Sequence, residues 1–270
     1  MNITFIGGGN MASALISGLL QQGYAAEQLR VVEINAESRE KIKHTLGVSA
    51  VAELADGVKG SDVILLAVKP QQLFELTQKL APLLNSQLIL SIAAGIRATD
   101  IIRWLGGYAR VVRAMPNTPS LVRSGVAGLY AAPGVGELDK KNAESILAAV
   151  GTTLWVDDEE MLHTVTAISG SGPAYVFYFI ESMQQAGIEL GLTPAQARQL
   201  SLQTFAGASK LASLSDEDVA VLRARVTSKG GTTEQAIQTM EENAIQCKII
   251  AAVHAANRRS RELSDEFSRI

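Results

Sequence analysis

The first half of the chain alternates short apolar runs with amphipathic segments. Seven runs rich in apolar and β-branched residues have the length of strands: 2–6, 29–34, 62–68, 87–93, 110–114, 125–130 and 153–156. Segments with apolar residues at three- and four-residue steps lie between most of them. Strands that alternate with helices at this spacing predict an α/β fold with a doubly wound, mostly parallel sheet.

The pattern changes at Asp157. Beyond it no segment has the character of a strand, and the sequence predicts helices at 159–168, 173–190, 194–211, 216–226 and 232–267. We therefore predict two domains, a sheet domain at residues 1–157 and an all-helical domain at 158–270. By analogy with small reductases of this plan, the helical domain supplies the substrate pocket and a dimer interface.

One apolar run has the length of a membrane span. Residues 161–180 contain no Asp, Glu, Lys or Arg, but they include His163, two glycines and Pro173. We interpret this run as a buried segment of a globular protein.

A glycine-rich loop follows the first predicted strand. Residues 7–12 read Gly-Gly-Gly-Asn-Met-Ala and fit the dinucleotide-binding pattern G-x-G-x-x-G/A. In that pattern Gly7 allows the tight turn, Gly9 lets a pyrophosphate approach the backbone, and Ala12 lets helix and strand pack closely. The first N–H groups of the helix then face the phosphates. The same loop could be an ordinary turn, but its place between a strand and a helix favours a nucleotide site.

The other loops at the carboxyl ends of the strands complete this predicted Rossmann-type site, because a ligand of an open parallel sheet lies there. We expect the cofactor to contact Ile6, Gly7, Gly8, Gly9, Asn10, Met11, Glu33, Asn35, Ala67, Val68, Lys69, Pro70 and Ala93. Lys69 is either a ligand of a ribose or phosphate or a solvated surface charge. Asn117, between two prolines, is either an amide facing a ligand or a turn cap.

Glu33 bears on the choice of cofactor. It stands where many NAD-binding proteins carry the acidic residue that binds the adenosine ribose, and its carboxylate would repel a 2′-phosphate. Asn35, Ser38 and Arg39 follow within reach of such a phosphate. A one-residue change of strand register would reverse the direction of Glu33. The sequence therefore predicts use of both NADPH and NADH, with the preference open.

Composition narrows the function classes. A hydrophobic fraction of 47% with 19% charged residues is typical of a globular protein. With a net charge of −3, the chain has no excess of positive charge with which to bind nucleic acid or an anionic membrane. The single cysteine, Cys247, excludes an internal disulfide and suits a reducing cytoplasm. The start of the chain has no basic region typical of a signal peptide. We expect a cytoplasmic protein with a small-molecule substrate and no metal.

Residues 226–237 are the most informative part of the second half. Two glycines precede Thr232, Thr233 and a predicted helix, and Thr232 with Gln235 fits a capping box. Ser228, the two threonines and the free N–H groups make a compact site for a small carboxylate, with no arginine required. A well-capped helix start explains the same pattern. A second small-residue loop, 169–175, is explained equally by close helix packing.

Five blocks stand in a fixed order along the chain: Gly7-Gly8-Gly9-Asn10-Met11, Ala67-Val68-Lys69-Pro70-Gln71, Met115-Pro116-Asn117-Thr118-Pro119, Ser169-Gly170-Ser171-Gly172-Pro173-Ala174-Tyr175 and Val226–Glu241. In this order, and over essentially the whole chain, they resemble the pyrroline-5-carboxylate reductase family. The last block is the family's signature and is highly specific.

The resemblance implies reduction of 1-pyrroline-5-carboxylate to L-proline with NADPH, or with NADH as a second cofactor. It also implies an intertwined homodimer, assembled in some members into a decamer. By position, the Thr233 hydroxyl is expected to bind the ring nitrogen of the substrate and to act in catalysis. Ser228, Gly231 and Thr232 match positions around the substrate carboxylate, and we also expect Asn117 to bind substrate. Two positions depart from the family pattern: Lys229, where some members carry proline, is expected to point away from the ligand, and Glu33 departs from the common preference for NADPH.

The chemistry of a cyclic imine fits a site without an obvious general base. Its iminium form is already an electrophile, so positioning and electrostatics can carry most of the barrier reduction. His44, His163 and His254 are scattered along the chain, and we interpret all three as structural.

Two other functions compete with the reductase. A β-hydroxyacid dehydrogenase shares the domain plan, but the chain has no lysine between Lys141 and Lys210 to serve as its general base. A non-catalytic NAD(P) sensor would need no substrate pocket, so the threonine-rich segment argues against it.

Overall fold

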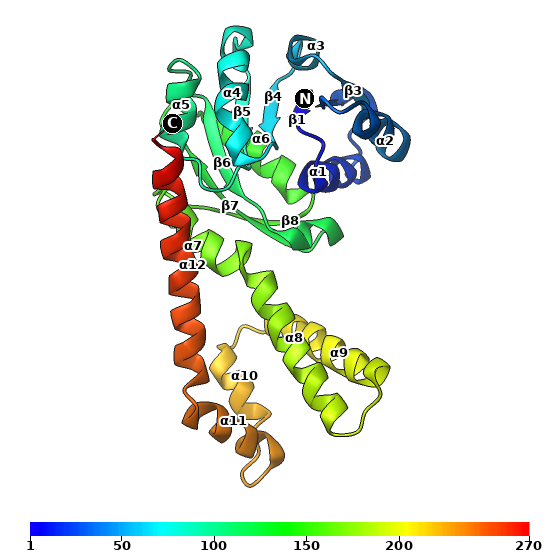
Figure 1. Ribbon diagram of the computed structural model, residues 1–270, viewed down its shortest axis with the longest axis vertical. Coiled ribbons are helices and arrows are strands. Elements are labelled where there is room, and N and C mark those ends of the chain that lie inside the picture. The colour runs from blue at the N-terminus through cyan, green and yellow to red at the C-terminus, as the bar shows by residue number, and fades with distance from the viewer. Residues whose placement is uncertain (270) are drawn as a thin grey trace. The chain divides into compact units, whose positions relative to one another are not determined.

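The computed structural model describes residues 1–269 and contains an eight-stranded sheet (Figure 1). The strands are β1 (Ile3–Ile6), β2 (Leu29–Val32), β3 (Ser49–Val51), β4 (Val63–Leu66), β5 (Leu88–Ser91), β6 (Val111–Met115), β7 (Gly125–Ala131) and β8 (Gly151–Trp155). Their order is β3-β2-β1-β4-β5-β6-β7-β8, and every pair is parallel except β6 with β7. The predicted doubly wound, mostly parallel sheet is confirmed, although the sequence analysis missed β3.

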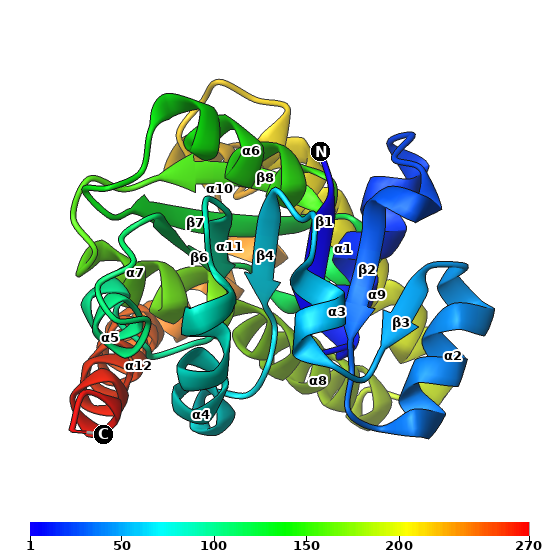
Figure 2. The same cartoon turned by 90° about the horizontal axis from the view of Figure 1, so that it is seen from above.

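Helices and short 3₁₀ turns connect these strands. The helices are α1 (Asn10–Gln21), α2 (Ala36–Leu46), α3 (Leu54–Val58), α4 (Pro70–Leu80), α5 (Ala98–Trp104) and α6 (Glu137–Ala148), and the 3₁₀ turns are η1 (Ala26–Gln28), η2 (Ala81–Leu83) and η3 (Thr118–Val122). Figure 2 shows β4, β1, β2 and β3 side by side, which is the order that a dinucleotide-binding half-sheet requires.

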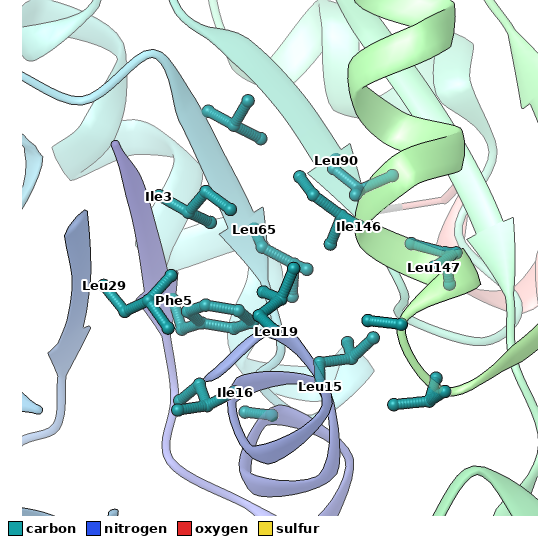
Figure 3. Packing of buried hydrophobic residues seen from close by; sticks show 14 of the residues in the cluster. Ile3, Phe5, Leu15, Ile16, Leu19, Leu29, Leu65, Leu90, Ile146 and Leu147 are labelled. Carbon is teal, nitrogen blue, oxygen red and sulfur yellow. The ribbon is translucent and has the colours of Figure 1, made fainter. Parts of the chain in front are cut away.

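Both faces of the sheet are covered by apolar side chains. Successive residues of a strand point to opposite faces, so Leu65 of β4 belongs to one cluster and Leu66 to the other. The first cluster packs β1, β4 and β5 against α1 and α6, with Phe5 and Leu15 fully buried (Figure 3). This two-sided burial is the reason that the central strands are continuous apolar runs in the sequence.

After Trp155 the described chain is helical. The elements are α7 (Met161–Val165), η4, a single π-helical turn (Thr166–Gly170), α8 (Gly172–Glu189), α9 (Pro194–Ser213), α10 (Val219–Arg225), α11 (Thr232–Glu242) and α12 (Ile245–Phe267). The chain forms two compact units: the sheet unit, which is Met1–Ser171 with the chain from Ala256 on, and the helical unit, which is Gly172–Ala255.

Two of the predicted helices are not single α-helices in the structure. The predicted helix at 232–267 is wrong as one element, because Ala244 takes a left-handed conformation (φ 52°) that ends the helical ladder between α11 and α12. The predicted helix at 159–168 is only partly α-helical, since η4 interrupts it. The same turn divides the apolar run 161–180. Among residues 1–269, none of the helices combines the length and the apolar character needed to cross a bilayer.

The last part of α12, which belongs to the sheet unit, makes polar contacts with the rest of that unit. Arg97 donates to Asp265 at 2.6 Å, and His163 Nδ1 lies 2.8 Å from the hydroxyl of Ser260. Burial lowers the pKa of His163 below the ordinary histidine value of 6.5, so the ring is neutral near pH 7. These contacts give His163 a structural role, as its position in the sequence suggested.

Candidate active site

The glycine loop lies where the carboxyl ends of three strands meet. The N–H of Gly7 donates to the carbonyl of Val32 on β2 (2.9 Å), and the N–H of Ala67, just beyond β4, donates to the carbonyl of Ile6 (2.8 Å). Gly7 has φ +98°, and a Cβ there would lie 2.8 Å from the Ala67 carbonyl oxygen. Only glycine fits this position, which is the topological switch point of the sheet.

Gly9 leaves open space in front of the first helix. It is the N-cap of α1 and makes no side-chain capping bond, and a Cβ built on it would meet no atom within 4 Å. The first N–H groups of α1 therefore face solvent with the positive end of the helix dipole behind them. A pyrophosphate fits this cradle, because it needs N–H donors and room to approach the backbone.

Glu33 points toward the glycine loop. One carboxylate oxygen accepts from the N–H of Gly8 (3.1 Å) and the other from the N–H of Asn35 (3.0 Å). Arg39 donates from Nη1 to the carbonyls of Glu33 (2.8 Å) and Ile34 (2.9 Å). A carboxylate and a guanidinium therefore lie together just beyond the carboxyl end of β2, at the edge of the sheet where the cofactor is predicted to bind. The orientation of Glu33, which strand register left open, is now decided.

The other residues predicted to contact the cofactor lie at the ends of β1, β2, β4 and β5 on the same edge of the sheet. Asn35 caps α2 by accepting from the N–H of Ser38 (2.8 Å), and Lys69 is exposed at the N-cap of α4. Ile6 and Ala93 are buried, Asn10 is exposed, and intermediate exposure is shared by Met11, Ala67, Val68 and Pro70. Their contact with a cofactor stays a prediction.

The segment predicted to bind substrate lies in the helical unit. It forms a turn, in which the N–H of Gly231 donates to the carbonyl of Ser228 (3.0 Å), and this turn leads into α11. Ser228, Lys229 and Thr232 are exposed, and Thr233 is half-buried. The three hydroxyl residues thus lie close together along the chain, around the start of α11.

The predicted capping box at this helix is wrong. The helix begins at residue 232, as predicted, so Gly231 and not Thr232 is its N-cap, and no side chain caps it. Glu234 instead reaches back, and its carboxylate accepts from the N–H of Gly230 (2.6 Å). A helix start with a glycine N-cap and no side-chain cap suits a small carboxylate better than a capped one does.

Asn117 is neither a local turn cap nor a freely presented amide. It is only 8% exposed, its Oδ1 accepts from the N–H of Val126 (2.9 Å), and its Nδ2 donates to the carbonyl of Ser169 (3.1 Å). The amide therefore joins the loop after β6 to β7 and to η4. Asn117 and the loop 169–175 are far apart in the sequence, and no local pattern indicates that they touch.

The part of the chain that the structure describes contains no group of three or more His, Cys, Asp or Glu residues that could hold a metal ion.

Two family models match the chain. Residues 159–263 match pyrroline-5-carboxylate reductase dimerisation, and residues 2–95 match NADP oxidoreductase, coenzyme F420-dependent. A pyrroline-5-carboxylate reductase of Pseudomonas aeruginosa is 46% identical over 266 residues, which cover 98% of this chain and 97% of that protein. That of Pasteurella multocida is 42% identical and covers 98% of both.

Solved structures agree with these relatives. A pyrroline-5-carboxylate reductase of Coxiella burnetii superposes with a TM-score of 0.93 at 42% identity, covering 97% of this chain and 98% of that one. A pyrroline carboxylate reductase of Plasmodium falciparum with NADP bound superposes with a TM-score of 0.88 at 29% identity, covering 98% of both chains.

Gly9→Ala is expected to weaken dinucleotide binding by about tenfold or more, because the new methyl group enters the space that the phosphates need. Its thermal unfolding is expected to match that of the wild type, since the methyl group meets no atom of the chain. The measurement is cofactor affinity by fluorescence titration, beside a melting curve.

Gly7→Ala is the matched control, because it is expected to destabilise the fold whereas Gly9→Ala is expected to leave stability unchanged. It is expected to lower the free energy of unfolding by about 1–3 kcal/mol, through positive φ and the clash with Ala67. Wild-type cofactor affinity in Gly9→Ala would contradict the phosphate cradle.

Proposed function

The chain belongs to the pyrroline-5-carboxylate reductase family, and we propose that its two units share the work of the reaction. The enzyme reduces 1-pyrroline-5-carboxylate to L-proline, the last step of proline biosynthesis, with NADPH as the reductant. The observation that carries this conclusion is the relationship itself, 46% identity over 98% of the chain.

The sheet unit binds the cofactor in this proposal. The N-terminus of α1 holds the pyrophosphate in the open space beside Gly9, and the loops after β4 and β5 line the rest of the edge. When bound, the reduced nicotinamide supplies a hydride to C5 of the ring, and a proton from solvent completes the amine of proline.

The helical unit holds the substrate. Ser228, Gly231 and Thr232 bind the carboxylate at the start of α11, where no side chain caps the helix. The hydroxyl of Thr233, at the second helical position, orients the ring nitrogen and relays a proton to it. Because the iminium carbon is already electrophilic, these residues act by placing the ring and by stabilising charge.

Glu33 and Arg39 support the use of NADH beside NADPH. The carboxylate of Glu33 faces the glycine loop and has further lone pairs for a ribose hydroxyl, whereas Arg39 lies at the same corner to offset the charge of a 2′-phosphate.

The chain forms a homodimer through its helical half, which matches the dimerisation family over residues 159–263. Large apolar side chains of α8, among them Phe177 and Tyr178, are 64% and 70% exposed in the single chain, as expected for a surface that a second copy covers. We further propose assembly of dimers into a decamer, which the family resemblance supports. A cytoplasmic location is also proposed, since the single exposed cysteine suits a reducing compartment.

The purified enzyme is expected to oxidise NADPH when pyrroline-5-carboxylate is added and to release L-proline in equal amount. The measurement is the loss of absorbance of the reduced nicotinamide, with amino-acid analysis of the product. A β-hydroxy acid with oxidised cofactor serves as the negative control. A folded protein that binds cofactor but consumes none would contradict the function.

Thr233→Ala is expected to lower kcat/KM for the imine roughly 10–100-fold, equivalent to about 1.5–3 kcal/mol for one directed hydrogen bond. Thr233→Ser keeps the hydroxyl and is expected to retain most of the activity. Steady-state kinetics with saturating NADPH measure both, and equal kinetics in Thr233→Ala and the wild type would remove Thr233 from the mechanism.

The ratio of kcat/KM for NADPH and NADH is expected to lie within about 100-fold in the wild type. Glu33→Gln is expected to shift this ratio toward NADPH, because the repulsion of a 2′-phosphate is removed. Glu37→Gln, an exposed carboxylate in the first turn of α2, is the matched control for a lost charge. An equal shift in both variants would argue against a specific role of Glu33.

A further inference from the structure

The carbonyl of Ser169 lacks its ordinary helical partner. In an α-helix this carbonyl would accept from the N–H of the residue four positions later, which is Pro173. Proline has no N–H, so the chain that passes from η4 into α8 leaves this acceptor without its α-helical donor. The Nδ2 of Asn117 supplies a donor at 3.1 Å.

Close packing holds the same turn against the sheet. A Cβ on Gly170 would lie 2.7 Å from the methyl group of Met115, the last residue of β6. A Cβ on Gly128 of β7 would lie 2.8 Å from Val165, which precedes η4. The backbone of the turn can therefore approach β6 and β7 only because these two positions are glycine.

The turn also has the π-helical form that often marks functional sites. The N–H of Ser171 donates to the carbonyl of Thr166 at 2.8 Å, five residues earlier. Ser171 is the last residue of the sheet unit before the chain enters the helical unit, and Asn117 stands just beyond β6 at the cofactor edge.

We propose that Asn117 is a positioning residue for the reduction. Its amide holds η4 against the carboxyl end of β6, and so fixes the last residues of the sheet unit from which the chain runs on to the substrate-binding segment. This inference rests on the proposed function, and it gives Asn117 a role through η4 in place of the direct substrate contact that the sequence suggested. Hydride transfer requires placement within a fraction of an ångström, so a looser turn affects the imine step more than cofactor binding.

Asn117→Ala and Asn117→Asp test this role in the full-length enzyme. The first removes both hydrogen bonds of the amide. The second keeps an acceptor for the N–H of Val126, but as a carboxylate at mildly alkaline pH it cannot donate to Ser169. Thr166→Val is the matched control, because it removes a hydroxyl bond within the same turn, to the carbonyl of Leu162, and leaves the Asn117 contacts in place.

Three quantities are measured: kcat and KM for pyrroline-5-carboxylate at saturating NADPH, the Kd of NADPH, and amide hydrogen exchange of residues 166–172. Both Asn117 variants are expected to lose about tenfold in kcat/KM for the imine, with the Kd of NADPH within about twofold of the wild type. Exchange in the turn is expected to become faster in both, and Thr166→Val is expected to resemble the wild type. If Asn117→Ala does not fold, Asn117→Asp carries the test.

Two outcomes would overturn the proposal: wild-type kinetics in both Asn117 variants, or equal losses of imine turnover and NADPH affinity, which would indicate general damage to the site. If the wild-type protein does not reduce the imine at all, the proposed function fails. Hydrogen exchange then tests whether the Asn117 amide holds η4 in place. Faster exchange in the variants would support this, and unchanged exchange would refute it.

Discussion

The structure depends on the close approach of β1 to β4 at residue 7. The two strands are in register up to Ile6 and Leu66, and the chain must then turn away within one residue without striking the Ala67 carbonyl. A glycine at φ +98° meets this demand, whereas the Cβ of any other residue would lie only 2.8 Å from that carbonyl oxygen. The turn delivers Gly9 to the start of α1 with open space before it, so one steric constraint in the sheet also creates the place that we propose for the phosphates.

In the mechanism that we propose, the reaction needs little from the protein beyond placement, and the candidate residues agree with this. The substrate segment offers hydroxyls and a helix start without a side-chain cap. The buried histidine of the sheet unit is neutral and bonded to a serine of α12. An electrophilic imine explains why the proposed site has hydroxyls and a helix start in place of a titrating histidine. Orientation and a favourable electrostatic field are sufficient to lower the barrier of its reduction.

A mechanism that depends on placement requires that the turn before α8 is held firmly. Pro173, the second residue of that helix, deprives the Ser169 carbonyl of its α-helical donor, and an amide from a loop more than fifty residues away replaces it. Met115 and Gly170 fit together at the same place. The loop after β6 thus has its shape fixed from two directions, by β7 through Val126 and by η4 through Ser169.

The sequence alone determined the alternation of strands and helices, the glycine loop and the family, because these follow from local periodicity and from residues adjacent in the chain. It did not reveal β3, a three-residue edge strand whose pairing with β2 is not a local property. It placed a helix through Ala244, whose left-handed conformation carries no glycine signal. Only the tertiary structure decided that Glu33 turns toward the glycine loop and that Asn117 reaches Ser169. Both are contacts between residues far apart in sequence, and the direction of a side chain depends on packing that no local pattern encodes.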